Sequence, residues 1–316
     1  MKNENGKTNE QNNQKIQNDG TRYALNEKIN RKDDLFKGVV FIVLSAFCYS
    51  LMSLFVRLAG DLPTFQKAFF RNLIAALVGF VLLLKSGSIK MQKGSLPALL
   101  GRSIAGTVGI LCNFYAIDHL PISDASILNK LAPFFSIVFS IIILKERASW
   151  RDLALVLTAF VGAVFVVKPS FDIMQSAPAL LGALGGLGAG LAYTFVRYLG
   201  RKGERTAYIV FFFSAFSCLT MLPMTILQYQ PMTWAQVGWL LLAGCAASGA
   251  QFSVTAAYSY APAKEVSVYD YSQVLFAALW GGVFLSEFPD FYSVIGYVII
   301  ISAAAIKTFS ARKHKT

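Results

Sequence analysis

The stretch LPISDASILNKLAPFFSIVFSIIILKERASWRD, from Leu120 to Asp152, decides the fold of this chain. Its apolar residues predict a helix, and its polar residues recur at positions i, i+3, i+4 and i+7, which lie on one face of a helix. That polar stripe consists of Ser126, Asn129, Lys130 and Pro133. The pattern predicts a membrane helix with one polar side.

The same pattern returns later as APAKEVSVYDYSQVLFAALWGGVFLSEFPDFYS, which starts at Ala261 instead of Leu120, an offset of 141 residues. The two stretches align without a gap and place similar residues at matching positions. The matching pairs are Pro121 with Pro262, Ser126 with Ser267, Asn129 with Asp270 and Glu146 with Glu287. The chain is therefore built from two copies of one unit, and the two copies of this helix carry most of the buried polarity.

The composition indicates a membrane protein. Of the 316 residues, 55% are hydrophobic and 15% are charged, whereas soluble chains average about 25% charged residues. Apolar runs of about 20 residues recur, which is the length that crosses ~30 Å of hydrocarbon as a helix. The runs do not alternate as the strands of a membrane β-barrel do. The predicted class is an all-α polytopic membrane protein.

The formal net charge is +12, which in a soluble protein would suggest nucleic-acid binding. Here the basic residues lie mostly in short connections and tails, where positive charge orients helices in a membrane. We therefore expect no nucleic-acid partner. The four cysteines lie inside apolar runs, and the two histidines are isolated, so the sequence predicts no metal site and no cofactor.

Ten spans are expected between two cytoplasmic tails. Residues 1–34 are rich in polar residues and are expected to be a disordered tail, and residues 311–316 form the other tail. Residues 35–170 and 177–310 are the two five-helix repeats. The expected spans are Gly38–Arg57, Phe65–Leu84, Leu96–Ile117, Ile122–Leu144, Leu153–Val167, Ala177–Arg197, Tyr208–Leu227, Trp234–Tyr258, Glu265–Leu285 and Tyr292–Phe309.

Basic residues gather in alternate connections, and such an excess marks the cytoplasmic side. Both termini are therefore expected in the cytoplasm, and the chain is expected in the cell membrane as a multi-pass protein. The basic groups are Arg31, Lys32 and Lys37 before span 1; Lys85, Lys90, Lys93 and Arg102 in the 2–3 loop; Lys145, Arg147 and Arg151 in the 4–5 loop; Arg197, Arg201, Lys202 and Arg205 in the 6–7 loop; and Lys307, Arg312, Lys313 and Lys315 at the C-terminus.

An odd number of spans in each unit forces the second copy to enter the membrane upside down. Matching loops then face opposite sides and should differ in charge. They do, because the segment KERASWRD at 145–152 becomes SEFPDFYS at 286–293, which keeps the glutamate and loses the basic residues. Such an inverted repeat is the architecture of secondary transporters, whose binding sites lie near the membrane midplane between the two copies.

The chain resembles the drug/metabolite transporter superfamily, in its ten-span branch with paired EamA domains. The resemblance covers Leu35 to Phe309 and rests on the two five-helix units together with a set of residues. These are Arg71 in Phe69-Phe-Arg71, Pro121, Pro262, Glu146 and Glu287. The resemblance implies transport by alternating access through a central cavity lined partly by spans 4 and 9. It implies no particular substrate.

Charged side chains at the bilayer centre cost ~2.5–3.5 kcal/mol each, so they usually serve a purpose. Arg71, Lys130 and Asp270 qualify. Lys130 either holds an anionic substrate group or neutralises Asp270; Pro133 favours the first role, because it frees the carbonyl of Asn129 beside Lys130. Asp270 either takes a coupling proton or pairs with Lys130 or Arg71. Arg71 is either a ligand or a membrane-interface anchor.

The candidate substrate-binding residues are Lys130, Asn129, Ser126, Asp270, Tyr271, Gln273 and Arg71. Aromatic residues that could stack on a substrate are Tyr49, Tyr115, Tyr193, Tyr258, Tyr260, Tyr271 and Trp280. The glycines Gly182, Gly186 and Gly190 fall four apart, and we interpret them as a face that lets another helix approach closely.

The favoured function is a secondary transporter of a small polar metabolite, a carboxylate or an amino acid, that is coupled to protons or works as an exchanger or facilitator. One alternative is an intramembrane lipid-modifying enzyme, against which stands the lack of clustered catalytic residues on any one face. The other is a membrane scaffold, which would not need charges at the midplane. The expected partners are the substrate and the lipid bilayer. The sequence does not decide whether the chain forms a homodimer.

Overall fold

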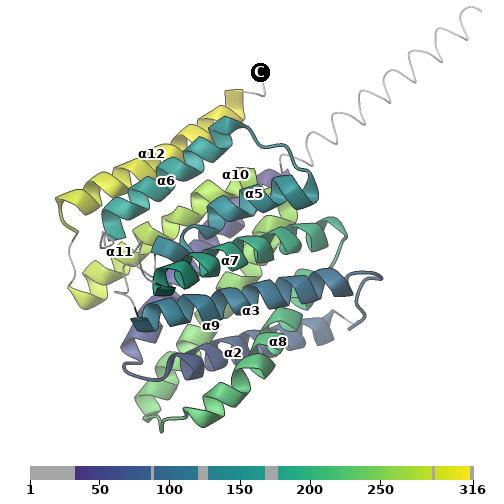
Figure 1. The fold of residues 1–316 in the computed structure, drawn as a ribbon, viewed down its shortest axis with the longest axis vertical. Coiled ribbons are helices and arrows are strands. Elements are labelled where there is room, and N and C mark those ends of the chain that lie inside the picture. The colour runs from purple at the N-terminus through teal and green to yellow at the C-terminus, as the bar shows by residue number, and fades with distance from the viewer. Residues whose placement is uncertain (1–32, 87–88, 120–126, 168–176, 287–288, 314–316) are drawn as a thin grey trace, which may run out of the picture.

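The computed structural model describes residues 33–86, 89–119, 127–167, 177–286 and 289–313. In these ranges the chain forms helices that lie side by side in a bundle (Figure 1). Predictions for the N-terminal tail, for Pro121 and Ser126, and for Glu287 fall outside the described residues. The helices are Asp33–Leu58, α2 (Thr64–Lys85), α3 (Leu96–His119), α5 (Ala132–Leu144), α6 (Trp150–Val167), α7 (Ala177–Arg201), α8 (Thr206–Leu227), α9 (Trp234–Tyr260), α10 (Ala263–Val266), the 3₁₀-helix η2 (Ser267–Tyr271), α11 (Ser272–Leu285) and α12 (Phe291–Lys313).

Over the described part of the chain, nine helices are long and apolar enough to cross a membrane. This confirms the all-α polytopic class. The ninth expected span, Glu265–Leu285, is not one regular helix but three consecutive pieces, α10, η2 and α11, and α11 has 14 residues. The helix α12 continues to Lys313, so it extends into the stretch that was expected to be the C-terminal tail.

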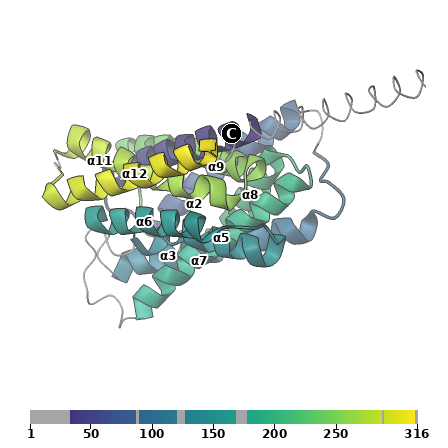
Figure 2. The same ribbon diagram turned by 90° about the horizontal axis from the view of Figure 1, so that it is seen from above.

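The two copies meet where equivalent helices pack against each other. Adding the offset of 141 residues to α2 gives residues 205–226, which nearly coincide with α8, and adding it to α6 gives residues 291–308, which lie in α12. The helices α2 and α8 are in contact, and so are α6 and α12. The α6–α12 pair forms one edge of the bundle and lies together in both views (Figures 1 and 2). Contacts between equivalent helices are what a twofold relation between the copies requires.

The backbone repeats the same irregularities in both copies. The amides of Lys130 and Leu131 bond to carbonyls three residues back, which is the 3₁₀ pattern, and η2 has that pattern at the matching place. Pro133 explains the break in the first copy, because it has no N–H to donate. Further on, Lys145 and Ser286 have φ values of 54° and 55°, and they too are 141 residues apart.

The glycine face predicted for α7 is confirmed. A Cβ atom at Gly186 would lie 2.6 Å from the carbonyl oxygen of Leu128, and one at Gly190 would lie 2.6 Å from Cβ of Phe135. A Cβ at Gly182 would meet the side chain of Leu128 at 2.7 Å. The glycines therefore let α7 approach the segment that carries Lys130.

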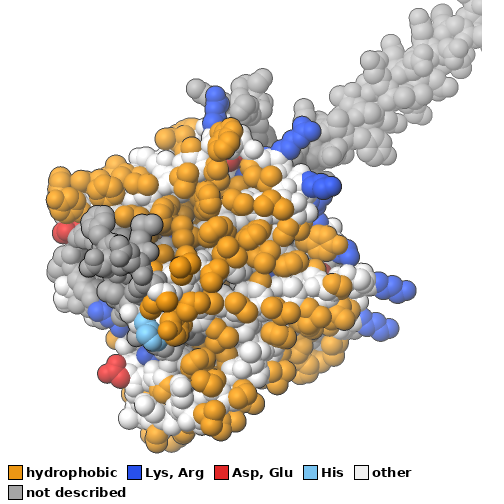
Figure 3. All heavy atoms as spheres, viewed as in Figure 1, with side chains coloured by type: hydrophobic (Ala, Val, Ile, Leu, Met, Phe, Trp, Pro, Cys, Tyr) orange, Lys and Arg blue, Asp and Glu red, His pale blue; other side chains and the backbone are white. Residues whose placement is uncertain are grey.

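The outer surface is mostly apolar, and the basic residues gather at one end. Large side chains such as Leu227 and Phe291 are 79% and 74% exposed, as expected for contact with lipid. Figure 3 shows this apolar surface, with most visible Lys and Arg side chains along its upper and right-hand edges. We call this the basic end. Its described members that form ion pairs or hydrogen bonds include Arg197, Arg201, Lys202, Arg205 and Lys307.

Candidate functional site

The candidate site lies where the two broken helices meet. Lys130 follows the first turn of the broken span in the first copy, and its Nζ donates a hydrogen bond to Oε1 of Gln273 at 2.6 Å. The same Nζ lies 3.7 Å from Oδ2 of Asp270, and the two side chains are only 14% and 12% exposed. The structure thus brings together three of the residues that the sequence singled out, two of them from the second copy.

Tyr271 holds the turn that carries Lys130. Its hydroxyl donates to the backbone carbonyl of Lys130 at 2.9 Å, and the residue is fully buried. Lys130 and Tyr271 are 141 residues apart, so they are equivalent positions in the two copies. Contact between equivalent residues places the pseudo-twofold axis at this point. Tyr271 supports the site through the backbone of Lys130.

A buried group of hydroxyls lies next to this axis. The Oγ atoms of Ser136 in α5 and Ser267 in η2 are 3.1 Å apart, and the hydroxyl of Tyr258 lies 3.5 Å from each of them. Ser267 is the repeat partner of Ser126, which lies outside the described residues. This cluster of three hydroxyls links α5, α9 and η2. Its members satisfy one another's hydrogen-bonding capacity in a region with little access to water.

Stacked tyrosines connect this group to a second set of charges. The rings of Tyr193 and Tyr258 stack with centroids 4.8 Å apart. The hydroxyl of Tyr49 lies close to Tyr193 and within electrostatic range of Arg71, Arg102 and Asp270. Tyr49 therefore lies within electrostatic range of Asp270 and of two arginines.

Arg102 is a site residue that the sequence analysis misplaced. It was counted among the basic residues of the 2–3 loop, but it lies inside α3 and is only 3% exposed. Its Nη2 donates to Oε1 of Gln251 at 3.2 Å, and its guanidinium carbon lies 3.8 Å from the ring centroid of Phe213. The signal was present, because Arg102 falls inside the expected span Leu96–Ile117. Gln251 also falls inside an expected span, Trp234–Tyr258, but it carries no charge.

Arg71 faces the same region. Its guanidinium carbon lies 6.0 Å from the ring centroid of Tyr49 in the first helix, and its Nε is buried without a hydrogen-bond partner among the described residues. Arg71 as a whole is half-buried. Asn129, by contrast, is exposed.

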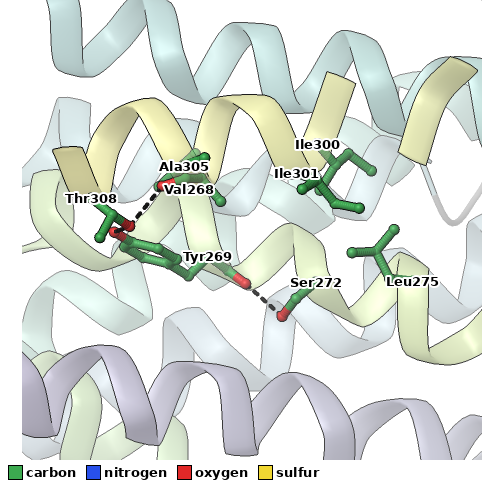
Figure 4. A pocket seen from close by; sticks show the side chains of 9 residues that line it. Val268, Tyr269, Ser272, Leu275, Ile300, Ile301, Ala305 and Thr308 are labelled. Atoms are coloured by element: carbon green, nitrogen blue, oxygen red, sulfur yellow. Dashed lines mark hydrogen bonds between the residues drawn. The ribbon is translucent and has the colours of Figure 1, made fainter. Parts of the chain in front are cut away.

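Two cavities lie elsewhere and are apolar. The first, of about 270 Å³, is a partly open pocket lined by η2, α11 and α12 and is shown in Figure 4. Its polar atoms pair locally, because Tyr269 and Thr308 share a hydrogen bond of 2.8 Å and Ser272 donates to the carbonyl of Tyr269. The second, of about 540 Å³, shares Leu275 and Ile301 with the first. No charged side chain lines the described part of either cavity, so neither suits a polar metabolite.

Comparison with known proteins places the chain among transporters. The model of the EamA-like transporter family matches residues 36–168 and 177–309. The chain is 36% identical to the pseudopaline exporter CntI of Pseudomonas aeruginosa over 273 residues, which are 85% of this chain and 95% of that protein. It is 22% identical to the S-adenosylmethionine uptake transporter of Rickettsia prowazekii over 87% of this chain and 94% of that protein. These names indicate transporters of small molecules rather than enzymes.

A solved crystal structure shares the fold. It superimposes with a TM-score of 0.76 at 17% sequence identity and covers 88% of this chain and 99% of that one. At this identity the likeness shows the fold alone. Within the described residues, no group of three or more His, Cys, Asp or Glu side chains is placed to hold a metal ion.

Proposed function

We propose that this chain, which belongs to the EamA-like transporter family, is a secondary transporter that exports a small polar metabolite bearing a carboxylate across the cell membrane. The observation that carries the proposal is the Lys130–Asp270–Gln273 group. It lies on the axis between the copies, where both membrane helices are broken. Broken helices at a repeat interface expose backbone groups to a substrate, which is the usual construction of a transporter site.

The residues suit a zwitterionic or anionic substrate. The ammonium group of Lys130 can receive a carboxylate, and the Asp270 carboxylate can receive an amine. Both side chains are nearly buried, so each interaction is stronger there than in water. Substrate binding would replace the existing 3.7 Å ion pair and thereby separate the two copies at the axis.

Ion pairs at the basic end support alternating access. Lys307 of the second copy lies 2.7 Å from Asp152 of the first, and Arg197 of the second copy lies 2.9 Å from Glu146 of the first. These contacts join the copies and close that end. In the proposed cycle, the two copies rock against each other and break these pairs, which opens the axis to the other side.

Export is favoured over uptake by the relatives. The relative named as an exporter is 36% identical to this chain, whereas the one named as an uptake transporter is 22% identical. The proposed substrate class, a carboxylate or an amino acid, comes from the charges of the site and from neither name.

The proposal predicts distinct behaviour for variants of the central pair. We expect Lys130→Met to abolish transport of labelled carboxylates and amino acids in proteoliposomes and to destabilise the protein, because it leaves Asp270 buried without its cation. The double variant Lys130→Met with Asp270→Leu should recover part of the melting temperature but no transport. The exposed Lys93→Met serves as the control for loss of a lysine. Full transport by the double variant would show that Lys130 is only a structural charge. A pH gradient across the same vesicles tests whether protons drive the flux.

We further propose that the basic end faces the cytoplasm. Arg205 donates to the side chain of Ser86 at 2.9 Å, and Lys202 donates to the carbonyl of Gly94 at 3.0 Å, so the 2–3 and 6–7 connections lie on the same side, as the charge pattern requires. Reporters fused after Thr316 and before Leu35 should both report cytoplasm, and one inserted after Tyr229 should report the outside. Termini on opposite sides of the membrane would contradict the inverted repeat.

A further inference from the structure

Positive charges outnumber negative ones between the two ends of the bundle. Among the described residues, the interior group contains Arg71, Arg102 and Lys130 but only the carboxylate of Asp270. Asp270 is also the only carboxylate among the electrostatic neighbours of Tyr49, Tyr193 and Tyr258. A buried charge without an opposite charge is costly. The interior therefore has an excess of positive charge that a bound anion would neutralise.

Arg102 is the most informative member of this group. It is 3% exposed, and its guanidinium contacts the neutral side chain of Gln251 and the ring of Phe213. A guanidinium has five N–H donors, yet its Nε is buried without a hydrogen-bond partner in the described residues. Gly106 leaves room for the guanidinium, because a Cβ atom there would collide with Nη1 of Arg102.

Arg71 in α2 is half-buried and shares two of these features. Its Nε is also buried and lacks a hydrogen-bond partner among the described residues, and its face contact is with the ring of Tyr49. Arg71 and Arg102 are electrostatic neighbours of one another and share Tyr49 as a third neighbour. Two like charges held together in this way repel one another unless an anion lies between or beside them.

We infer that Arg71 and Arg102 form a subsite for a second acidic group, so that the substrate carries at least two carboxylates. This inference rests on the proposed transport function. In this arrangement Lys130 and Asp270 receive the carboxylate and amine at one end of the substrate, and the two arginines receive the other carboxylate. Unused N–H donors in a fixed planar group favour a carboxylate, which can accept two of them at once.

Two matched pairs of probes test the subsite. Glutamate differs from 2-aminobutyrate by the carboxylate at the end of its side chain, and succinate differs from propionate by one added carboxylate. Binding is measured as the thermal stabilisation of the purified full chain during titration with each probe. We expect the dicarboxylate of each pair to bind at least about tenfold more tightly, which is the effect of one charge-assisted contact. Arg102→Gln and Arg71→Gln should each remove that preference, because they weaken the binding of the dicarboxylate more than the binding of the monocarboxylate.

The design separates a binding role from a structural one. If Arg102 is an uncompensated buried charge, its removal should leave the melting temperature of the ligand-free Arg102→Gln protein unchanged or raise it. If Arg102 is structural, its loss should lower the melting temperature and weaken the binding of both probes of a pair equally. If Arg102→Gln does not fold, Arg102→Lys is used in its place. It keeps the charge and should therefore keep part of the preference for the dicarboxylate. The exposed Arg151→Gln is the matched control and should bind as the unchanged protein does.

The outcomes also distinguish this inference from the proposed function. Equal affinity for the mono- and dicarboxylate of both pairs would overturn the second subsite and leave the transporter of a single carboxylate standing. No stabilisation by any of the four probes would overturn the carboxylate assignment itself, and the subsite with it.

Discussion

At the basic end Lys307 lies 2.7 Å from Asp152 and 3.0 Å from Glu265, whereas Lys130 in the interior lies 3.7 Å from its one carboxylate, Asp270. The first lysine is 8% exposed and the second 14%, so burial does not separate them. The two lysines differ instead in the number of their acidic partners and in the distances to them. Lys307, which holds the copies together, has two close carboxylates, whereas Lys130, which is assigned to the substrate, has one carboxylate that is more distant.

Lys307→Met removes the lysine that has two close carboxylates, and it should have the largest effect. It leaves Asp152 and Glu265 facing each other without their cation, so we expect a loss of about 3–5 kcal/mol in the free energy of unfolding. Denaturant unfolding in detergent measures this loss. Adding Asp152→Asn and Glu265→Gln to Lys307→Met should restore part of it. A Lys307→Met loss no larger than that of Lys130→Met would mean that the two regions do not differ.

Gly186→Ala tests whether close packing, rather than charge pairing, holds the interior turn. A Cβ there would lie 2.6 Å from the carbonyl oxygen of Leu128, so the backbone must shift, at a cost of about 1–3 kcal/mol. Gly238→Ala in α9 is the matched control, because a Cβ at Gly238 meets nothing within 4 Å; it should stabilise by about 0.5–1 kcal/mol. Similar melting temperatures for the two variants would show that α7 has room to move away.

Glu146→Gln should have the smallest effect of the three. Arg197 keeps its hydrogen bond to the carbonyl of Ser259 at 2.9 Å, and glutamine can still accept from Arg197, so we expect a loss of about 1–2 kcal/mol. Arg201 lies 3.8 Å from the same carboxylate and is 52% exposed. The control Arg201→Gln should therefore change stability by less than about 0.5 kcal/mol. Equal losses would place Glu146 among ordinary surface charges.

The fold could be predicted from the sequence because apolar length, loop charge and an internal repeat are local or one-dimensional properties. The contact between Lys130 and Asp270 was one of the alternatives weighed, since buried opposite charges tend to pair. The break before Pro133 had a visible cause. The matching break in η2 did not, because position 274 is a valine.

Other parts of the site depend on tertiary packing, which the sequence marks weakly or not at all. Arg102 was assigned to a loop because it lies near the start of a span, and only the packing of Phe213 and Gln251 shows that it faces inward. The Asp152–Lys307–Glu265 group joins three distant segments. Its members appear in the sequence only as separate charges close to helix ends.

The shared left-handed backbone at Lys145 and Ser286 bears on the descent of the chain. The turn is the same whether its residue is charged or neutral, so the geometry of the unit does not depend on the charge that orients it in the membrane. Loop charge was therefore free to change after the unit was duplicated. An ancestor made of one unit, with balanced loop charges, would have inserted in both directions and paired with an inverted copy of itself.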